Sequence, residues 1–399
     1  MRRPELDAER LWLLIVAVLT SILASQAILA LPSVGLQAAM VAAVGLGLLW
    51  LVMARNRRFL DPAWVFVLSI YLLDAGGIAL QAAGSPVPMV IVASLAPLPF
   101  AVTSLFAHPE RAWRLAWLAP LLGLAILGGL SLGWSADPGY GGRKLIQWLI
   151  TGVAPAAAVL ALASVTRPAG WRIVAGAAFT YAVVLLAIGT TTLYPGRLVF
   201  FEANPIWVAR ACDIGALVVL FGPVPWRAKV VLLPPMLLAG YRTDSLGPTV
   251  GLVIGIALGV AEAIRTAPIS RRRVWLSIGV LGAGTAFAVT LAVGAISLAP
   301  SAALAPIVDD PNITSRAEYL DIASRMFAGA PILGTGLGSF AAAGAADLYP
   351  HNLVAEVASE LGVVGLALLA GWLALAIRGA LRSPLLVALV AASSVFALF

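Results

Sequence analysis

The chain has 399 residues, of which 61% are hydrophobic and only 11% are charged, and its mean hydropathy is +1.01. A soluble globular domain is typically about 45–50% apolar and about 25% charged, so this composition excludes that class and indicates a polytopic membrane protein. The formal net charge of +7 would suit nucleic acid, but the basic residues follow a membrane topology instead, so we predict no nucleic-acid partner.

Apolar runs long enough to cross a bilayer, about 20 residues each, follow one another along the chain. We predict spanning helices over 11–31, 35–54, 63–83, 88–106, 115–133, 144–164, 173–194, 206–223, 229–241, 246–263, 274–299, 353–377 and 384–399. The run at 229–241 is short and contains Pro234-Pro235, so it is either bent or not a full span. The predicted fold class is all-α: a polytopic transmembrane helical bundle of about 12–13 spanning segments in a single integral-membrane domain, residues 1–399.

The basic residues predict the orientation, because cytoplasmic loops are enriched in Lys and Arg. Most of them precede the first segment or lie in alternate loops, and we predict that this face is cytoplasmic. The remaining ones fall on the opposite face: Arg143, Lys144, Arg197, Arg210, Arg242, Arg316 and Arg325. Each could simply pair with a neighbouring acid. As a set they suggest a polyanion handled on the outer side, and phosphate is the anion that arginine binds best.

The longest external segment, 300–352, is predicted to be a short helical extracytoplasmic segment rather than a separate domain. An amphipathic helix is expected in it over 315–327, with Ser315 and Glu318 at capping-box spacing. We expect this helix to lie on the membrane surface. Arg316 falls on its apolar face, where either a snorkelling side chain or a lipid-phosphate ligand would explain it.

Five stretches, in order within residues 115–380, carry a resemblance to a known family. They are SLGWSADPGYGGRKL (131–145), FFEANPIWVAR (200–210), AGYRTDSLGPTVGL (239–252), SRAEYLDIASRMFAGAPILGTGLGSF (315–340) and YPHNLVAEVASELGVVG (349–365). In the last stretch, His351-Asn352 is followed after nine residues by Gly362-x-x-Gly365. Together they resemble the bacterial O-antigen ligase and polymerase family, integral-membrane glycosyltransferases that use polyprenyl-diphosphate-linked glycans. Tyr241-Arg242-Thr243 keeps the arginine of the family's frequent Ser-Arg-Gly but not its small neighbours.

The resemblance implies that a glycan moves from polyprenyl (undecaprenyl) diphosphate to an acceptor hydroxyl at the periplasmic, extracytoplasmic side of the bacterial inner membrane. It implies no metal, cofactor or nucleotide, because the energy resides in the lipid diphosphate bond. The motif spacing favours a ligase, with an acceptor such as lipid A-core. A polymerase of the same family, extending lipid-linked repeat units, and a relative that glycosylates protein remain alternatives. From another class, a secondary transporter or flippase is disfavoured because the sequence has no internal repeat.

The leaving diphosphate requires positive charge, and arginine is always charged and donates in a bidentate geometry. We assign this role to Arg242 and Arg210, with Arg316 third and Lys144 as an outer contributor. His351 is the candidate general base, since a neutral imidazole accepts a proton near pH 7. The alternative is that His351 is an interfacial residue beside a helix start that Asn352 caps.

Further candidates for substrate binding are Asn204, Asn352, Glu318 and Trp134, the last of which could line an acceptor mouth with Asp137. Trp is also common at membrane interfaces for structural reasons. Glu356 and Glu360, one turn apart, should face the bundle and pair with cations because buried carboxylates are costly. Gly362, Gly365 and Gly371 are expected to allow close helix packing. We predict no metal site: Cys212 is the single cysteine and no metal-ligand spacing recurs.

Overall fold

The computed structural model describes residues 67, 70, 71, 94, 95, 98–162, 168–192, 194–200, 203–266, 311–344, 349, 350, 352–381 and 383–396. Within these ranges the chain is mostly helical, and β-pairing is limited to an isolated bridge between Thr190 and Val199. The predicted all-α class is confirmed. The predicted segments 11–31, 35–54 and 274–299 lie outside the described residues, as do most of 63–83 and the first part of 88–106.

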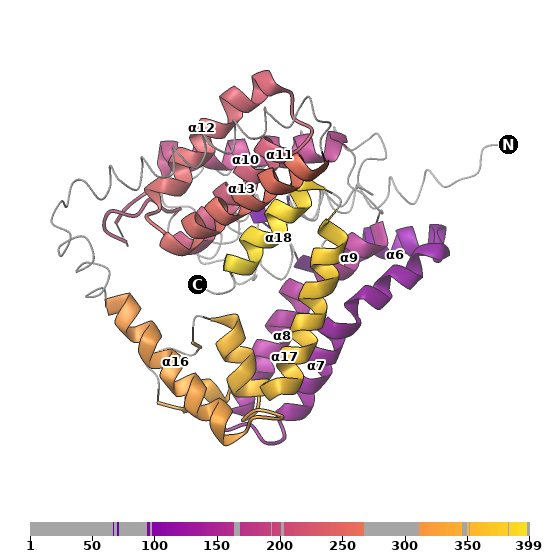
Figure 1. The fold of residues 1–399 in the computed structure, drawn as a ribbon, viewed down its shortest axis with the longest axis vertical. Coiled ribbons are helices and arrows are strands. Elements are labelled where there is room, and N and C mark those ends of the chain that lie inside the picture. The colour runs from indigo at the N-terminus through magenta and orange to yellow at the C-terminus, as the bar shows by residue number, and fades with distance from the viewer. Residues whose placement is uncertain are drawn as a thin grey trace, which may run out of the picture.

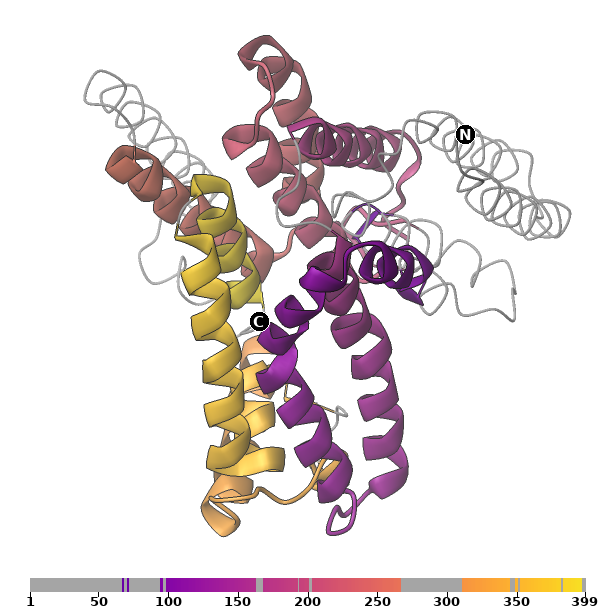
Figure 2. The ribbon, with the colours of Figure 1, turned by 90° about the vertical axis from the view of Figure 1, so that its right-hand side faces the viewer.

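The helices form two groups that are separated in Figure 1. The upper group comprises α10 (Pro168–Ile188), α11 (Pro205–Phe221), α12 (Trp226–Arg242), α13 (Leu246–Thr266) and α18 (Pro384–Phe396). The lower group comprises α7 (Ala119–Ser131), α8 (Pro138–Trp148), α16 (Pro311–Gly329) and α17 (Leu353–Ala380). Helices α6 (Leu98–Ala107) and α9 (Ala154–Leu162) pack against each other beside the lower group, and α17 also contacts α18. Figure 2 shows α17 running alongside α7 and α8.

Five continuous helices among the described residues are long and apolar enough to cross a membrane, which identifies a multi-pass membrane protein. They are Pro109–Ser131, Pro138–Leu162, Gly170–Ile188, Leu246–Thr266 and Leu353–Ala380. Each overlaps a predicted spanning segment. Three further predicted segments form the shorter helices α11, α12 and α18, of 17, 17 and 13 residues. Helix α12 continues through Pro234 and Pro235, so the prolines do not divide it.

Small residues bring the upper helices close together. A Cβ on Gly215 of α11 would lie 2.4 Å from the Cβ of Ala178 in α10, so only glycine fits at this crossing. Gly240 of α12 faces Asp213 of α11 in the same way: its Cβ position is 3.1 Å from Asp213 Oδ1. Because the chain reverses between α11 and α12, this contact places the beginning of α11 beside the end of α12.

Helix α17 is interrupted at Gly362, where φ is 64° and ψ is −160°. The break leaves backbone N–H groups without helical acceptors, and the preceding loop supplies acceptors instead. The Val363 amide donates to the Pro331 carbonyl at 2.9 Å and the Val364 amide donates to the Ile332 carbonyl at 3.2 Å. Gly362 is therefore needed for its left-handed backbone, a role different from the predicted helix packing.

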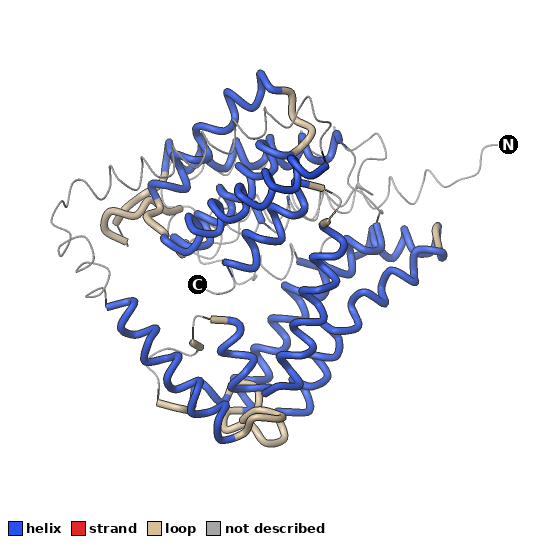
Figure 3. Tube along the Cα trace, viewed as in Figure 1, coloured by secondary structure: helices blue, strands red, loops and turns tan. Residues whose placement is uncertain are grey.

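The same loop is also bonded to α17 on the N-terminal side of the break. The Thr335 amide donates to the Ser359 carbonyl at 3.0 Å, and the Gly336 amide donates to the Glu360 carbonyl at 2.9 Å. Figure 3 shows this loop meeting the connection between α7 and α8 at the lower end of the molecule. The loop thus holds together segments that are far apart in sequence: Trp134, which donates a hydrogen bond to the Gly334 carbonyl, is 200 residues away from it.

The start of α16 differs from the prediction. The prediction of a capping box formed by Ser315 and Glu318 is wrong, because α16 begins at Pro311 and Ser315 lies inside the helix. Proline is favoured in the first turn of a helix, where its fixed φ is helical and its missing N–H costs no hydrogen bond. The capping pattern was the weaker of the two helix-start signals in this segment.

We predict that Gly362→Ala lowers the free energy of unfolding by about 1–3 kcal/mol or more, because a left-handed non-glycine residue is strained. Its Cβ would also lie 2.4 Å from the Ile332 carbonyl oxygen. Thermal unfolding of the purified protein in detergent measures the effect. Gly176→Ala in α10, where a Cβ meets nothing within 4 Å, is the matched control and should leave the melting temperature unchanged or slightly raised. Equal melting of the two variants would contradict this role of Gly362.

Candidate active site

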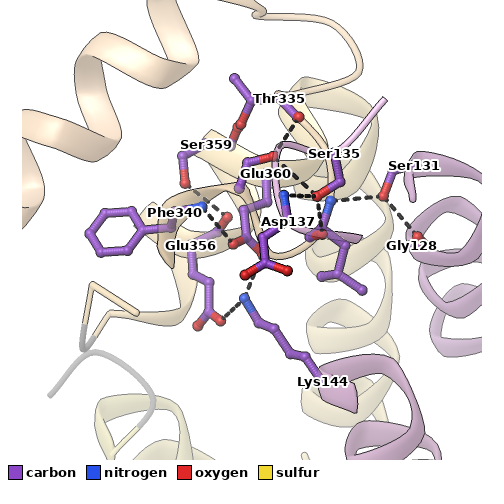
Figure 4. Close-up of polar contacts among 12 residues, drawn as sticks. Gly128, Ser131, Ser135, Asp137, Lys144, Thr335, Phe340, Glu356, Ser359 and Glu360 are labelled. Atoms are coloured by element: carbon purple, nitrogen blue, oxygen red, sulfur yellow. Dashed lines mark hydrogen bonds and ion pairs between the residues drawn. The ribbon is translucent and has the colours of Figure 1, made fainter. Parts of the chain in front are cut away.

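An ionic cluster connects α8 to the first turns of α17. Lys144 Nζ lies 2.5 Å from Glu360 Oε2 and also forms an ion pair with Glu356 Oε1 (Figure 4). The side chain of Glu360 is only 1% exposed, while those of Lys144 and Glu356 are 19% and 18% exposed. Glu356 and Glu360 thus face the bundle and pair with a cation, as predicted. With two carboxylates against one ammonium group, the cluster carries one excess negative charge.

Glu360 has a second partner in the loop that precedes α17. Its Oε1 accepts a hydrogen bond from the Phe340 amide at 3.3 Å (Figure 4). Phe340 is fully buried and packs edge-on against Tyr319 of α16, with ring centroids 6.2 Å apart. The buried carboxylate therefore links α8, α16 and α17 through a charged contact, a backbone contact and an aromatic contact. A charged group that is removed from water requires such ion pairs and hydrogen bonds to offset the cost of burial.

A serine network fastens the same loop to the connection between α7 and α8. Ser131 Oγ accepts from the Leu337 amide at 3.0 Å, and Ser135 Oγ donates to the Leu337 carbonyl at 2.7 Å (Figure 4). Ser339 Oγ accepts from the Ala136 amide at 2.9 Å. These bonds fix the Leu337–Ser339 part of the loop against the connection between α7 and α8.

Alternating glycines allow the loop to pass this closely. Gly334, Gly336 and Gly338 have φ of 70°, 99° and 92°, all in the left-handed region. A Cβ on Gly334 would lie 2.2 Å from the Glu360 carbonyl carbon, and one on Gly338 would lie 2.5 Å from the Gly141 nitrogen. The alternation in GTGLG was the sequence signal for this docking, and the sequence analysis did not use it.

The predicted residues Trp134 and Asp137 belong to this scaffold. Trp134 Nε1 donates to the Gly334 carbonyl at 3.2 Å, although the residue remains 44% exposed. Asp137 caps α8 by accepting from the Tyr140 amide at 2.8 Å. Lys144, predicted as an outer ligand of the diphosphate, is engaged by Glu356 and Glu360. Each of these side chains therefore has a structural contact that the sequence analysis did not assign to it.

Asn352 and Asn204 each cap a helix. Asn352 Oδ1 accepts from the Ala355 amide at 3.0 Å at the start of α17, which confirms the predicted N-cap. Asn204 Oδ1 accepts from the Ile206 amide at 2.9 Å at the start of α11. His351 lies outside the described residues, between Pro350 and Asn352. Its candidate role as a base stays a prediction.

The two arginines assigned to the diphosphate lie at the same end of the α11–α12 pair. Asp213 of α11 and Gly240 of α12 face each other. Arg210 lies one turn before Asp213, and Arg242 lies two residues after Gly240, so both arginines are near this contact. Arg242 is exposed and ends α12; its carbonyl accepts from the Leu198 amide at 2.8 Å. The turn that follows contains Asp244 at φ 47°, the non-glycine residue with positive φ in the described part of the chain.

Tyr349 connects the arginine end of α11 to the ionic cluster. Arg210 lies within electrostatic range of Tyr349. Tyr140 of α8 lies within electrostatic range of Tyr349 as well as of Lys144, Glu356 and Glu360. Tyr349 is thus near a residue of the upper helix group, Arg210, and near a residue of the lower group, Tyr140. In sequence it precedes the predicted base, His351, by two residues. Neither tyrosine was identified from the sequence.

Helix α16 contributes packing to this region. Tyr319, Ile322 and Ala323 are buried in a cluster with Phe340, so protein covers this side of the helix, whereas Leu320 is 42% exposed. Glu318 is exposed, and Arg325 forms an ion pair with Asp321 on the exposed side. The side chain of Arg316 lies outside the described residues. The predicted placement of α16 on a membrane surface stays a prediction.

Within the described ranges, no group of three or more His, Cys, Asp or Glu side chains could hold a metal ion. The polar side chains of the site are arginines, tyrosines and one lysine that is paired with two carboxylates. Such a set can bind an anion through Arg210 and Arg242 and can orient hydroxyl groups through Tyr140 and Tyr349.

Two comparisons with known proteins bear on these residues. A family model described as O-antigen ligase matches residues 231–370. The matched segment begins within α12 and ends within α17, so it contains Arg242, α16 and Asn352. It also contains the loop with Gly334, Gly336 and Gly338, called the glycine loop below. A search of curated proteins gave no match.

We predict that Lys144→Met destabilises the protein by about 3–5 kcal/mol, because removal of one partner leaves buried carboxylates uncompensated. Arg143→Met on the same helix is the matched control: Arg143 is exposed beside the Tyr140 ring, 5.9 Å from its centroid. Neutralising the acids as well, in Lys144→Met with Glu356→Gln and Glu360→Gln, should recover much of the loss. Thermal unfolding in detergent measures all three proteins. If the lysine variant melts like the arginine variant, the cluster does not hold α8 to α17.

Proposed function

We propose that the chain is a membrane glycosyltransferase of the ligase type, because a family model described as O-antigen ligase matches residues 231–370. It transfers a glycan from polyprenyl diphosphate to an acceptor hydroxyl, such as one on a lipid A-core glycan. The reaction takes place at the periplasmic side of the bacterial inner membrane, where the predicted topology puts Arg210, Arg242 and His351. The single observation that supports this most strongly is that Arg210 lies within electrostatic range of Tyr349, two residues before His351.

The proposed reaction needs no covalent enzyme intermediate, because diphosphate is already a stable leaving group. The acceptor oxygen forms a bond to the anomeric carbon of the donor glycan. The bond between that carbon and the diphosphate oxygen breaks, and its electron pair leaves with the diphosphate. The acceptor proton passes to a nitrogen of His351. Positioning and electrostatic stabilisation then supply most of the rate enhancement.

Arg210 and Arg242 are the proposed diphosphate ligands. Both lie at one end of the α11–α12 pair, and guanidinium groups match phosphate oxygens in a bidentate geometry. Arg242 is exposed and can therefore reach a lipid-linked substrate. Arg316 remains a third proposed ligand. Within a partly dry site, the attraction between these charges and the diphosphate is much stronger than in water.

The excess negative charge of the Lys144 cluster argues for a revised role for Lys144. A diphosphate would be repelled by Glu356 and Glu360, so we propose that Lys144 positions α17 and does not bind the donor. Asn352, Asn204 and Trp134 support the site through the contacts that they make to backbone groups. Glu318, exposed on α16, remains a proposed contact to the substrate.

The reaction can be assayed with purified protein, a polyprenyl-diphosphate oligosaccharide and candidate acceptors, without added metal or nucleotide. We expect His351→Ala to lower turnover by about 10²–10⁴-fold, the usual contribution of a general base, while leaving thermal stability intact. The sequence offers a matched control in the other of its two histidines: His108, which is 44% exposed beside Glu110. His108→Ala should retain normal turnover. Near-normal turnover of His351→Ala would refute the assignment of the base.

The pattern of products separates a ligase from a polymerase in the same assay. One addition to each acceptor is the outcome expected of the proposed ligase, and a ladder of additions would instead identify a polymerase. Movement of the substrate across a vesicle without a new bond would identify a transporter and overturn the proposal.

For the diphosphate ligands, Arg242→Ala should raise the apparent KM for the donor at least about tenfold and change that for the acceptor little, since a charge-assisted contact contributes about 1.5–3 kcal/mol. Arg325→Ala removes an exposed arginine that pairs with Asp321 and serves as the matched control. Initial rates at varied donor and acceptor concentrations measure both constants. Equal loss for the two substrates, or an equal effect of Arg325→Ala, would count against the proposed role.

A further inference from the structure

The end of α7 remote from the glycine loop has a separate feature that glycosyl transfer does not use. The span Pro109–Ser131 begins with a 3-10 helix, η3 (Pro109–Leu118). A 3-10 helix has three residues per turn, so side chains three apart lie above one another. Arg111, Arg114 and Trp117 therefore form one row along η3.

Both ends of this row have partners in the protein. Arg111 Nη1 donates to the Leu162 carbonyl at 2.6 Å and to Ser104 Oγ at 2.9 Å, so it caps the end of α9. Trp117 lies beside Gly379 near the end of α17, where a Cβ would be 3.8 Å from its ring. The row thus runs from the last turn of α9 to the last turn of α17.

Arg114, in the middle of the row, has one side-chain nitrogen without an acceptor among the described residues. Its Nη1 is buried and has no hydrogen-bond partner among the described residues. A guanidinium group is always charged and can only donate, so a buried N–H without an acceptor is costly. The nearest acid in sequence, Glu110, lies 3.3 Å from His108 and is 69% exposed. Among the described residues, this N–H therefore has an open hydrogen-bonding position.

The surroundings of Arg114 are those of a membrane interface. Trp113 is 63% exposed and Phe106 is 85% exposed, and Trp117 remains 36% exposed. Amphipathic aromatic rings gather at the level of lipid headgroups. Arg378, next to Gly379 and exposed, adds a second cation near Trp117.

We propose that Arg114 binds the phosphate of an anionic phospholipid, in the leaflet at this end of the Pro109–Ser131 span. Arg114 is partly exposed, so its guanidinium group donates to the phosphate oxygens on the exposed side, and Arg378 favours a headgroup that lacks a compensating cation. Trp113 and Trp117 flank the headgroup. This site is independent of the proposed transfer reaction, because it lies at the opposite end of α7 from Ser131 and the glycine loop.

The test compares lipid binding by the full chain reconstituted in phosphatidylcholine nanodiscs with increasing phosphatidylglycerol. Native mass spectrometry counts retained lipids, and thermal unfolding reports stabilisation. The wild-type protein should retain phosphatidylglycerol in preference to phosphatidylcholine. Arg114→Gln should weaken that preference about tenfold, as expected for loss of a charge-assisted contact. Arg227→Gln, which removes an exposed arginine stacked on Trp226, is the matched control for loss of surface charge and should keep the preference.

Three outcomes would overturn the site: an unchanged preference in Arg114→Gln, an equal loss in Arg227→Gln, or full stabilisation by inorganic phosphate in pure phosphatidylcholine. If the glutamine variant does not fold, the lipid preference of Arg114→Lys tests the proposal instead. It keeps the charge but loses the planar fork, so it should prefer phosphatidylglycerol with weaker retention than the wild type. A lysine variant without any preference would also overturn the proposal.

Discussion

Burial of the Glu360 carboxylate constrains the structure around the beginning of α17. A charge in a membrane-spanning helix is tolerated only when other groups satisfy it. Lys144 supplies an ammonium group from α8, and Phe340 supplies a backbone amide from the glycine loop. These requirements fix where α8 and the loop can lie relative to α17, and Phe340 carries the constraint further to Tyr319 of α16.

The break at Gly362 is the second half of this arrangement. An unbroken α17 would keep its own hydrogen bonds and would leave the loop carbonyls of Pro331 and Ile332 without the amides of Val363 and Val364. Interrupted backbone within a span is acceptable where protein covers it, and here the loop provides that cover. The loop and the break therefore depend on each other. Their joint effect is to hold the start of α17, and hence Asn352, in a defined place.

The sequence predicted the helices well because apolar length is a strong signal within a membrane. It also predicted the cap at Asn352 and a cation partner for Glu356 and Glu360. It did not predict that the partner would be Lys144, since residues 144 and 360 are 216 apart in sequence and their meeting depends on tertiary packing. The start of α16 was missed because two start signals competed and Pro311 prevailed over Ser315. The left-handed backbone at Gly362 has no local signal beyond the glycine itself.

We propose that Arg210, Arg242 and His351 surround one diphosphate, while the Lys144 cluster excludes it. A structure determined by electron cryo-microscopy with a non-reactive polyprenyl-diphosphate analogue bound tests this most directly. We expect density for the diphosphate between the guanidinium groups of Arg210 and Arg242, with the His351 imidazole facing the anomeric position. Phosphate density against Lys144, or arginines that each turn to a carboxylate of their own away from the ligand, would contradict it.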